Sequence, residues 1–364
     1  MLYLLFIFPA LALLGIAIVY TLPVFGAHPS GERLARIRAS PHHDGQKFVH
    51  LEPTGMGTPD LRRLPEFFRR GKTIPAAPLP TLPLTPADFP RLPEDEVRVT
   101  WFGHSLLLVE MNGRRLLIDP VFSPVPSPFS FIGTPAFAME HDYDLDSFPL
   151  PDAVLLSHDH YDHLDYPTIK KLARTDVPFI CALGVGAHLE RWGIAPGRIT
   201  ELDWWEATTF AGITITATPT RHFTGRAIKR FQTLWCGFAL RSGDRNILYA
   251  GDSGYGIHGP RIGERLGPFD LAFVECGQYN EMWPDIHAFP EDGVKTWADV
   301  RADRIMPVHW GRFKLAMHDW NEPPQRLLAA TPAADRPRVL TPRIGQRFNP
   351  LAPATTDRWY ENDQ

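Results

Sequence analysis

The chain has 364 residues, of which 44% are apolar and 12% aromatic, so it can bury a large core and is not a disordered protein. Its formal net charge of -4 means that the chain lacks the overall positive charge that favours nucleic-acid binding, and no nucleic-acid partner is expected. The cysteines are odd in number and widely spaced, which argues against a disulfide framework or a cysteine metal cluster (Cys181, Cys236 and Cys276).

The first 27 residues carry no charged side chain and predict a hydrophobic membrane anchor. Residues 2–20 are nearly all apolar, a run long enough to cross a bilayer. A signal peptide would normally carry a basic residue before such a run, and none is present here. Arginines instead follow the run, at positions 33, 36 and 38. The positive-inside tendency then places the remaining chain in the cytoplasm. Two alternatives stay open: cleavage near residues 26–27, and a hydrophobic helix buried against the domain.

An N-terminal extension is expected over residues 28–94, and its second half is rich in proline. Seven prolines recur between residues 75 and 93. Their missing amide donors and fixed φ angles exclude a regular helix or a central strand, which leaves an extended strap. The catalytic domain is expected beyond it, over residues 95–350, with residues 351–364 as a C-terminal tail.

Apolar patterns beyond the strap predict strands that come first in hairpin-like groups and later alternate with helices. Strands are expected at residues 97–102, 105–110, 115–119, 153–157, 178–183, 212–219, 234–240, 246–251 and 271–277. Helices are expected at residues 168–174, 187–192, 290–300 and 324–330. This order indicates an α/β fold of two sheets with helices outside.

A histidine-rich segment, residues 157–165, directly follows the apolar run 153–156. Its sequence is Ser-His-Asp-His-Tyr-Asp-His-Leu-Asp, and imidazole nitrogen and carboxylate oxygen are ligands that zinc prefers. A strand ending in this loop can aim His158 and His160 at one ion. The turn that follows would direct Asp162 and His163 toward a second. The alternative, a polar surface loop, is disfavoured by four ligand-type residues at this spacing.

Further ligand-type residues stand at the ends of later apolar runs and could complete a two-metal site: His222, Asp252 and His309. Each alone would be weak evidence. A lone histidine is more often a surface or packing residue, and an aspartate after a strand is usually a turn former or helix cap. They gain weight as evidence because they follow the first cluster in order along the chain.

These motifs together resemble the metallo-β-lactamase superfamily, whose members share HxHxDH followed by a histidine, an aspartate and a histidine. The chain is most similar to one branch, the N-acylphosphatidylethanolamine-hydrolysing phospholipase D and its bacterial relatives. The branch resemblance is carried by residues 103–105, 118–123, 157–165, 219–226, 251–255, 267–272 and 308–311. It covers roughly residues 97–330 and implies an αββα sandwich of two mixed sheets with the metals at one edge.

The resemblance also implies seven metal ligands in two groups that share a bridge. One zinc would be held by His158, His160 and His222, the other by Asp162, His163 and His309, with Asp252 bridging the two together with a water or hydroxide. Two Zn²⁺ ions per chain are therefore expected. Oxygen-reducing diiron relatives carry a glutamate at the position of His160, so histidine there favours zinc and hydrolysis over electron transfer.

Two cations about 3.5–4 Å apart lower the pKa of a bridging water and clamp the attacking and leaving oxygens. Asp162 and Asp252 are therefore candidate catalytic residues as well as ligands, and Asp162 could orient the nucleophile or receive its proton. His104 and Asp119 stand in family motifs at strand ends and are candidates to hold the ligand imidazoles. A purely structural role is the alternative for both.

Substrate residues are suggested by residues 277–283 and the histidine that follows them. This segment resembles the lipid-hydrolase branch, which places Tyr279, Trp283 and His287 at the substrate. His287 could contact substrate or donate a proton to a leaving oxygen, and Arg226 could bind a phosphate. The alternative for His287 is a packing role, and the alternative for Arg226 is a salt bridge. The chain departs from the phospholipase at residues 124–141 and throughout the N-terminal region.

The leading hypothesis is a membrane-associated, dinuclear zinc phosphodiesterase of phospholipase D type that acts on N-acylphosphatidylethanolamine-like lipids. The anchor would hold the catalytic edge close to lipid head groups. One alternative is a lactonase or another metallohydrolase of soluble substrates. Another is a non-catalytic metal-binding membrane protein, although such a protein has no need for an open dinuclear site.

Overall fold

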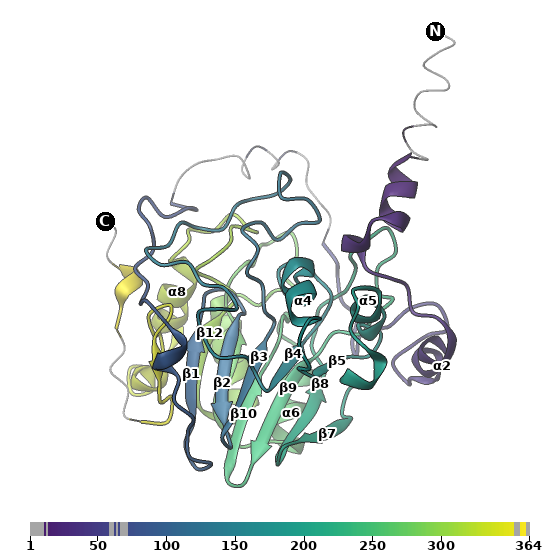
Figure 1. Cartoon of the computed structure of the whole chain (residues 1–364). Coiled ribbons are helices and arrows are strands. Elements are labelled where there is room, and N and C mark those ends of the chain that lie inside the picture. The colour runs from purple at the N-terminus through teal and green to yellow at the C-terminus, as the bar shows by residue number, and fades with distance from the viewer. Residues whose placement is uncertain are drawn as a thin grey trace.

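The computed structural model of the chain describes residues 11, 14–57, 62, 65, 72–352 and 357–361. Two mixed β-sheets lie face to face, with helices on the outside of the sandwich (Figure 1). The predicted fold class, two mixed sheets flanked by helices, is therefore confirmed.

The first sheet has seven strands in the order β13-β1-β2-β3-β4-β5-β6. These are β1 (Arg98–Trp101), β2 (Leu107–Met111), β3 (Arg114–Ile118), β4 (Ala153–Leu156), β5 (Phe179–Ala182), β6 (Ile199–Leu202) and β13 (Arg347–Phe348). The pairs from β13 to β3 are antiparallel, and those from β3 to β6 are parallel.

The second sheet has six strands in the order β12-β11-β10-β9-β8-β7. These are β7 (Ala207–Phe210), β8 (Ile213–Thr218), β9 (Gly237–Ser242), β10 (Arg245–Tyr249), β11 (Phe269–Glu275) and β12 (Ala302–Val308). The pairs from β7 to β10 are antiparallel, and β10, β11 and β12 run parallel. As a result β8, β10, β11 and β12 all end at the same edge of this sheet.

The helices are α2 (Gly31–Ala39), α4 (Tyr166–Leu172), α5 (Gly186–Arg191), α6 (His258–Arg265), α7 (Pro290–Asp299) and α8 (Glu322–Ala330). Helix α7 packs on β11 and β12, and α5 packs beside β6. The four predicted helices are present as α4, α5, α7 and α8, each beginning one to two residues earlier or at the predicted start. Helices α2 and α6 and strands β6, β7 and β13 were not predicted. The three strands are only partly buried, so their apolar pattern is weak.

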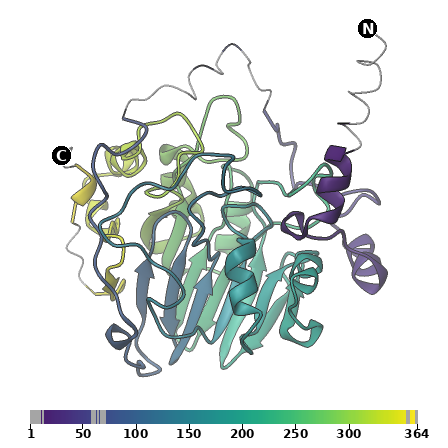
Figure 2. The same cartoon turned by 45° about the horizontal axis from the view of Figure 1, so that its top comes forward.

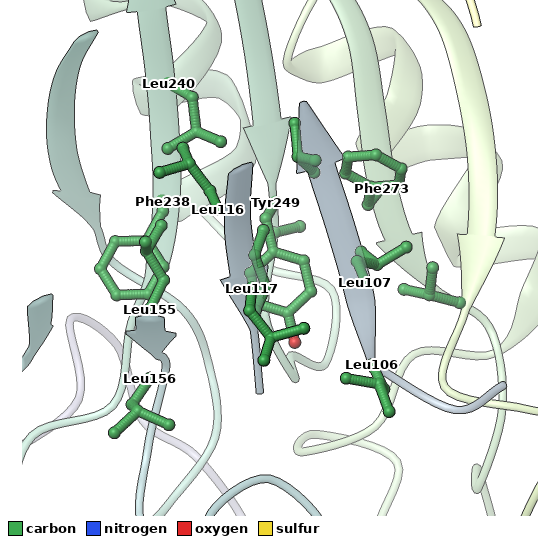
Figure 3. Packing of buried hydrophobic residues seen from close by; sticks show 14 of the residues in the cluster. Leu106, Leu107, Leu116, Leu117, Leu155, Leu156, Phe238, Leu240, Tyr249 and Phe273 are labelled. Carbon is green, nitrogen blue, oxygen red and sulfur yellow. The ribbon is translucent and has the colours of Figure 1, made fainter. Parts of the chain in front are cut away.

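The space between the sheets is filled by large apolar side chains from both of them. Leu117 and Leu155 of the first sheet face Phe238, Tyr249 and Phe273 of the second, and all five are fully buried (Figure 3). Burying a side chain of this size contributes about 1.5–3 kcal/mol. This packing fixes the strands, and therefore fixes the positions of the loops that follow them.

The N-terminal segment includes a helical stretch at residues 14–21, which stands away from the sandwich (Figures 1 and 2). The predicted anchor also includes residues 1–10, 12 and 13, which lie outside the described residues. Within the described part of the chain, no helix has both the length and the apolar character needed to cross a bilayer.

The proline-rich strap is extended and packs on the sandwich. Leu79 makes a bridge with Met139, and Thr81 makes one with Ile344. The only regular turn in it among the described residues is a short 3-10 helix at Pro86–Asp88. Part of the predicted C-terminal tail is also packed, because the buried ring of Trp359 stacks on Trp310, with the ring centroids 5.4 Å apart.

Candidate metal centre

The ligand-type residues of the sequence meet at one edge of the sandwich. The loop 157–165 follows β4, and His222 lies beyond the end of β8. Asp252 follows β10, and His309 follows β12 directly. Because these strands end at one edge, residues far apart in the chain are brought within a few ångströms of each other.

Three imidazole nitrogens form the first group. The Nδ1 atom of His160 lies 3.0 Å from His158 Nε2 and 3.1 Å from His222 Nε2. His222 donates from Nδ1 to the carbonyl of Ile286 at 2.8 Å, so the neutral ring carries its lone pair on Nε2. A tetrahedral zinc with bonds of 2.0–2.1 Å separates its ligand atoms by about 3.3 Å. The spacing of the three nitrogens therefore fits a single ion.

A second group lies beside the first and contains both carboxylate and imidazole. Ligand atoms of His104, Asp162, His163 and His309 all lie within 4.8 Å of one another. Asp162 Oδ2 is 3.5 Å from His163 Nε2 and accepts a hydrogen bond from His104 Nε2 at 2.8 Å. His104 thus contacts a predicted ligand.

The carboxylate of Asp252 lies between the two groups. Its Oδ2 atom is 3.0 Å from His163 Nε2 on one side. On the other side the same oxygen is 3.9 Å from His158 Nε2 and 3.8 Å from His222 Nε2. Its Oδ1 atom is 3.2 Å from His309 Nδ1. This carboxylate is therefore placed to bridge two ions.

Several buried atoms of the cluster lack a hydrogen-bond partner in the described structure. They are Nδ1 of His104, Nε2 of His163, Nε2 of His309 and Oδ1 of Asp252. Each such atom costs about 1–3 kcal/mol when it is left unsatisfied. Cations bound among them would offset this cost, so the residues present fit a metal centre.

The electrostatics of the cluster also favour metal binding. Burial, reinforced by neighbouring histidines, lowers the pKa of His158, His222 and His309 well below the usual value, which keeps their lone pairs free. Burial raises the pKa of Asp252 to about 7. Burial also disfavours the charged form of His163, but two neighbouring carboxylates outweigh it and raise its pKa.

A buried carboxylate fixes one of the ligand imidazoles from behind. Asp119 Oδ2 accepts hydrogen bonds from His163 Nδ1 at 2.8 Å, from the Ser157 hydroxyl at 2.5 Å and from the Tyr249 hydroxyl at 2.6 Å. Its Oδ1 atom accepts from the Ser157 amide at 2.8 Å. A carboxylate behind a ligand histidine holds the ring so that Nε2 faces the metal. The Ser105 hydroxyl similarly contacts His309, with its oxygen 3.0 Å from Nδ1 of that ring.

Three residues around the centre have backbone conformations that L-residues rarely adopt. His104, Asp119 and His309 have φ angles of 54°, 44° and 69°. Such a conformation costs on the order of 1–3 kcal/mol and persists where surrounding contacts hold it. All three follow strands, so the sharp turn at the strand end aims each side chain at the cluster.

The predicted substrate residues Tyr279 and Trp283 direct their polar groups elsewhere. The Tyr279 hydroxyl donates to Glu322 at 2.6 Å, and its ring stacks on His318. Trp283 donates its indole proton to the carbonyl of Gln278 at 2.9 Å. These contacts stabilise the loop 277–283 and do not bring either polar group to the metal ligands.

Arg226, the predicted phosphate contact, directs its guanidinium to backbone carbonyls. The guanidinium is buried and donates to the carbonyls of Asp159 at 2.8 Å and Leu164 at 2.7 Å, within the histidine-rich loop. On its other side it donates to the carbonyl of Val24 at 3.0 Å. Arg226 therefore joins the loop that carries four predicted ligands to the N-terminal segment.

Replacing Arg226 with glutamine is expected to lower the free energy of unfolding by about 2–4 kcal/mol, because buried carbonyls lose a charged donor. Bound metal should fall in parallel, since the guanidinium holds the histidine-rich loop. Urea unfolding and metal analysis test this, with Lys229→Gln, an exposed change in the same loop, as the control. Unchanged stability and metal content, combined with weaker binding of phosphate substrates, would instead support the phosphate role.

Two acidic residues near the centre were missed by sequence reasoning. Asp159 is buried and accepts from the Gly225 amide at 2.8 Å and the Thr233 hydroxyl at 3.0 Å. Glu275 is the last residue of β11 and is 1% exposed. In the sequence, the only sign that Glu275 lies near the centre was that a charged residue stands inside an apolar run, at the end of a predicted strand.

A sandwich of two mixed sheets with a buried cluster of histidines and carboxylates at one edge defines a class of metal-dependent hydrolases. A family model described as "Beta-lactamase superfamily domain" matches residues 114–310, and the chain belongs to this superfamily. The predicted superfamily is thereby confirmed.

Two relatives and one solved structure illustrate the similarity. An uncharacterized protein of Mycobacterium tuberculosis is 40% identical over 343 residues, covering 91% of both chains. The N-acyl-phosphatidylethanolamine-hydrolyzing phospholipase D 1 of Caenorhabditis elegans is 31% identical over 262 residues, covering 68% of this chain and 73% of that protein. The structure of Igni18, a metallo hydrolase of Ignicoccus hospitalis, matches with a TM-score of 0.52 at 22% identity, covering 69% of this chain and 97% of that one.

Proposed function

We propose that the protein is a dinuclear zinc phosphodiesterase of phospholipase D type that cleaves N-acylphosphatidylethanolamine-like lipids. The observation that carries this proposal is the position of Asp252, whose carboxylate lies between two groups of ligand-type residues. A single-metal site would not need a buried carboxylate that faces both. The similarity to the nematode phospholipase D supports the substrate class.

In this proposal the first ion is held by the three-histidine group and the second by the group that contains Asp162. These ligands are His158, His160 and His222 for one ion, Asp162, His163 and His309 for the other, with Asp252 shared. Histidine at position 160 supports zinc, a metal without redox chemistry. When bound, two zinc ions would supply Lewis-acid stabilisation of the phosphoryl group and a water of lowered pKa.

The protein's own groups then position the reactants. Asp162 accepts a hydrogen bond from His104 and stays partly exposed, with 14% of its side chain accessible, so it can orient an attacking water. The His287 ring packs edge-on against His222, with the ring centroids 4.9 Å apart, and its side chain is also partly exposed. It can therefore reach the oxygen of the departing alcohol and supply its proton.

We further propose that the enzyme works at a membrane surface. The helical stretch 14–21 exposes large apolar side chains, and so does the loop that follows β3; these are Leu14, Ile16, Tyr20, Phe131 and Ile132. The 3-10 helix Pro23–Phe25, which follows the helical stretch, contacts this loop, because the Phe25 ring packs on Phe129, which stacks on Phe131. Exposed apolar side chains in neighbouring segments are typical of a surface that meets lipid or a partner.

A substrate panel with metal analysis tests the function. Purified full-length protein is expected to carry two zinc ions and to release N-acylethanolamine from N-acylphosphatidylethanolamine in vesicles. Chelator-treated protein is the control, and it should regain activity when zinc is restored. A panel of lactones is assayed beside the lipid. Lactone turnover without phosphodiester turnover would overturn the proposal, as would a single retained metal.

A further inference from the structure

The segment at residues 20–27 connects the exposed helical stretch to the sandwich, and we call it the docking segment. Its backbone carbonyls accept hydrogen bonds from side chains at the end of α5. Arg191 donates to the Gly26 carbonyl at 2.5 Å, and the Trp192 indole donates to the Pro23 carbonyl at 2.6 Å. Because these are specific hydrogen bonds to the backbone, they hold the segment in one position against the sandwich.

A buried guanidinium joins the docking segment to the histidine-rich loop, residues 157–165. Arg226 donates through Nη2 to the Val24 carbonyl of the docking segment at 3.0 Å. Through Nη1 it donates to the carbonyls of Asp159 at 2.8 Å and Leu164 at 2.7 Å. Since the guanidinium is planar and rigid, the position of the docking segment constrains the loop that carries four predicted ligands.

An imidazole makes a second connection between the same two segments. The Ala27 amide donates to Nδ1 of His188 at 2.9 Å, and Nε2 of this ring lies 3.2 Å from Asp159 Oδ2. Asp159 stands between the predicted ligands His158 and His160 in the chain. A displacement of the docking segment would therefore act on the metal-binding loop both through its backbone and through this side chain.

The docked position also gathers exposed apolar and basic side chains on one side of the molecule. Tyr20 lines the same cavity as Lys229, which is exposed and follows Ile228, a side chain that is 62% exposed. The Phe25 ring packs on Phe129 in the loop that follows β3. Apolar side chains flanked by cations are complementary to a lipid surface with anionic head groups.

We propose that contact with an anionic lipid surface strengthens metal binding, because both events require the docking segment in the position seen here. This inference rests on the proposed action at a membrane surface. Lipid meets the helical stretch, the loop after β3 and the loop of Arg226 together when the segment is docked, so it favours the docked form. The docked form keeps Arg226 and His188 in place as positioning residues for the histidine-rich loop. By linkage, metal binding must strengthen lipid binding by the same factor.

A pair of glycines separates the docking contact from the metal ligands. Gly26 has a φ angle of 73°, and a Cβ added to it would overlap Nδ1 of His188. Gly26→Ala therefore displaces the docking segment without changing a ligand. Gly31 has a φ angle of 56°, and no described atom lies within 4 Å of the place its Cβ would take. Gly31→Ala thus adds the same methyl group, under similar backbone strain, away from the contact.

The coupling is measured as vesicle binding by the full-length protein, zinc-loaded and chelator-treated. The vesicles contain phosphatidylcholine and phosphatidylglycerol in equal parts. Zinc is expected to lower the apparent Kd for vesicles about 10-fold in the wild type and in Gly31→Ala, but less than about 2-fold in Gly26→Ala. Competition with a chromophoric chelator, with and without vesicles, must give the same factor for zinc affinity. Urea unfolding and circular dichroism check that Gly26→Ala is folded.

A second variant reaches the same contact from the side of the sandwich. Trp192→Phe removes the indole donor to the Pro23 carbonyl but keeps an aromatic ring at the position where Trp192 packs on Arg226, 5.0 Å from the guanidinium. The coupling factor is expected to fall from about 10-fold to about 3-fold. An undiminished factor in both variants, or in Trp192→Phe alone where Gly26→Ala does not fold, would overturn the inference.

The remaining outcomes separate this inference from the proposals on which it stands. Equal vesicle binding by the zinc-loaded and chelator-treated wild type would overturn the coupling and leave the membrane surface standing. Absence of vesicle binding in both forms would overturn both. Zinc-dependent binding that persists in full in Gly26→Ala would show that head groups contact the metal ions directly, and the route through the docking segment would fail. None of these measurements needs turnover, so the substrate panel decides the phosphodiesterase function separately.

Discussion

Replacing Asp252 with alanine is expected to release both metal ions and to lower turnover by at least about 1,000-fold. Its carboxylate faces both ligand groups, with Oδ2 3.0 Å from His163 Nε2 and 3.8 Å from His222 Nε2. Without it, the three-histidine group has no negatively charged ligand, and two cations would repel each other across an empty space. Metal analysis of the purified variant, together with its kcat, checks this expectation.

A matched control separates loss of metal from loss of fold. Asp244 lies exposed in the turn between β9 and β10, so Asp244→Ala removes the same charge away from the site. This control should retain two ions and full activity. Circular dichroism and urea unfolding should show that Asp252→Ala remains folded, because burial raises the pKa of Asp252 and its ionised form is costly to bury. Two ions retained in a folded Asp252→Ala protein would contradict the bridging role.

Asp119→Ala is expected to cause the largest loss of stability, about 3–5 kcal/mol. The fully buried carboxylate accepts hydrogen bonds from Ser157, His163 and Tyr249, and alanine leaves all of these donors unsatisfied. Zinc affinity should also fall about 10- to 100-fold, because His163 loses the group that orients its ring. Urea unfolding of the chelator-treated protein gives the stability. Competition with a chromophoric chelator gives the zinc affinity.

Tyr249→Phe is the matched control for the Asp119→Ala prediction. It removes one of the donors to Asp119 but keeps the carboxylate and the packing of the ring, so it should cost about 1 kcal/mol and leave zinc affinity unchanged. A similar loss of zinc affinity in Tyr249→Phe would show that the whole buried network orients His163. An unchanged affinity in Asp119→Ala would remove Asp119 from the set of supporting residues.

The sheets and the edge at which the ligands meet could largely be predicted from the sequence. Strands β4, β8 and β10 are apolar runs that end in ligand-type residues, so both the strand and the ligand are local features of the sequence. The edge strands β6 and β7 were missed, because a strand that is only partly buried has a weak apolar pattern. The helix α6 was also missed, because its sequence contains glycine and proline, which are poor helix formers.

The role of Arg226 and the position of Glu275 could not be predicted in this way. A guanidinium can bind a phosphate, a carboxylate or backbone carbonyls, and its sequence neighbours do not select among them. The fold selects the carbonyls of Asp159 and Leu164, because β8 and β9 place the intervening loop against the histidine-rich loop. For Glu275, its partner His287 lies beyond the loop that follows β11, and only the path of that loop brings the two together.

The sequence by itself therefore determined the superfamily, the candidate ligand residues and the edge at which they would gather, because residue spacing and strand pattern are properties of short segments. The tertiary structure alone decided how the ligands are supported. It placed Asp252 between two groups, set Asp119 behind His163, and directed Arg226 onto the loop that carries the histidines. Hydrogen-bond partners that lie so far apart in the sequence depend on how the two sheets pack, and no single motif determines that packing.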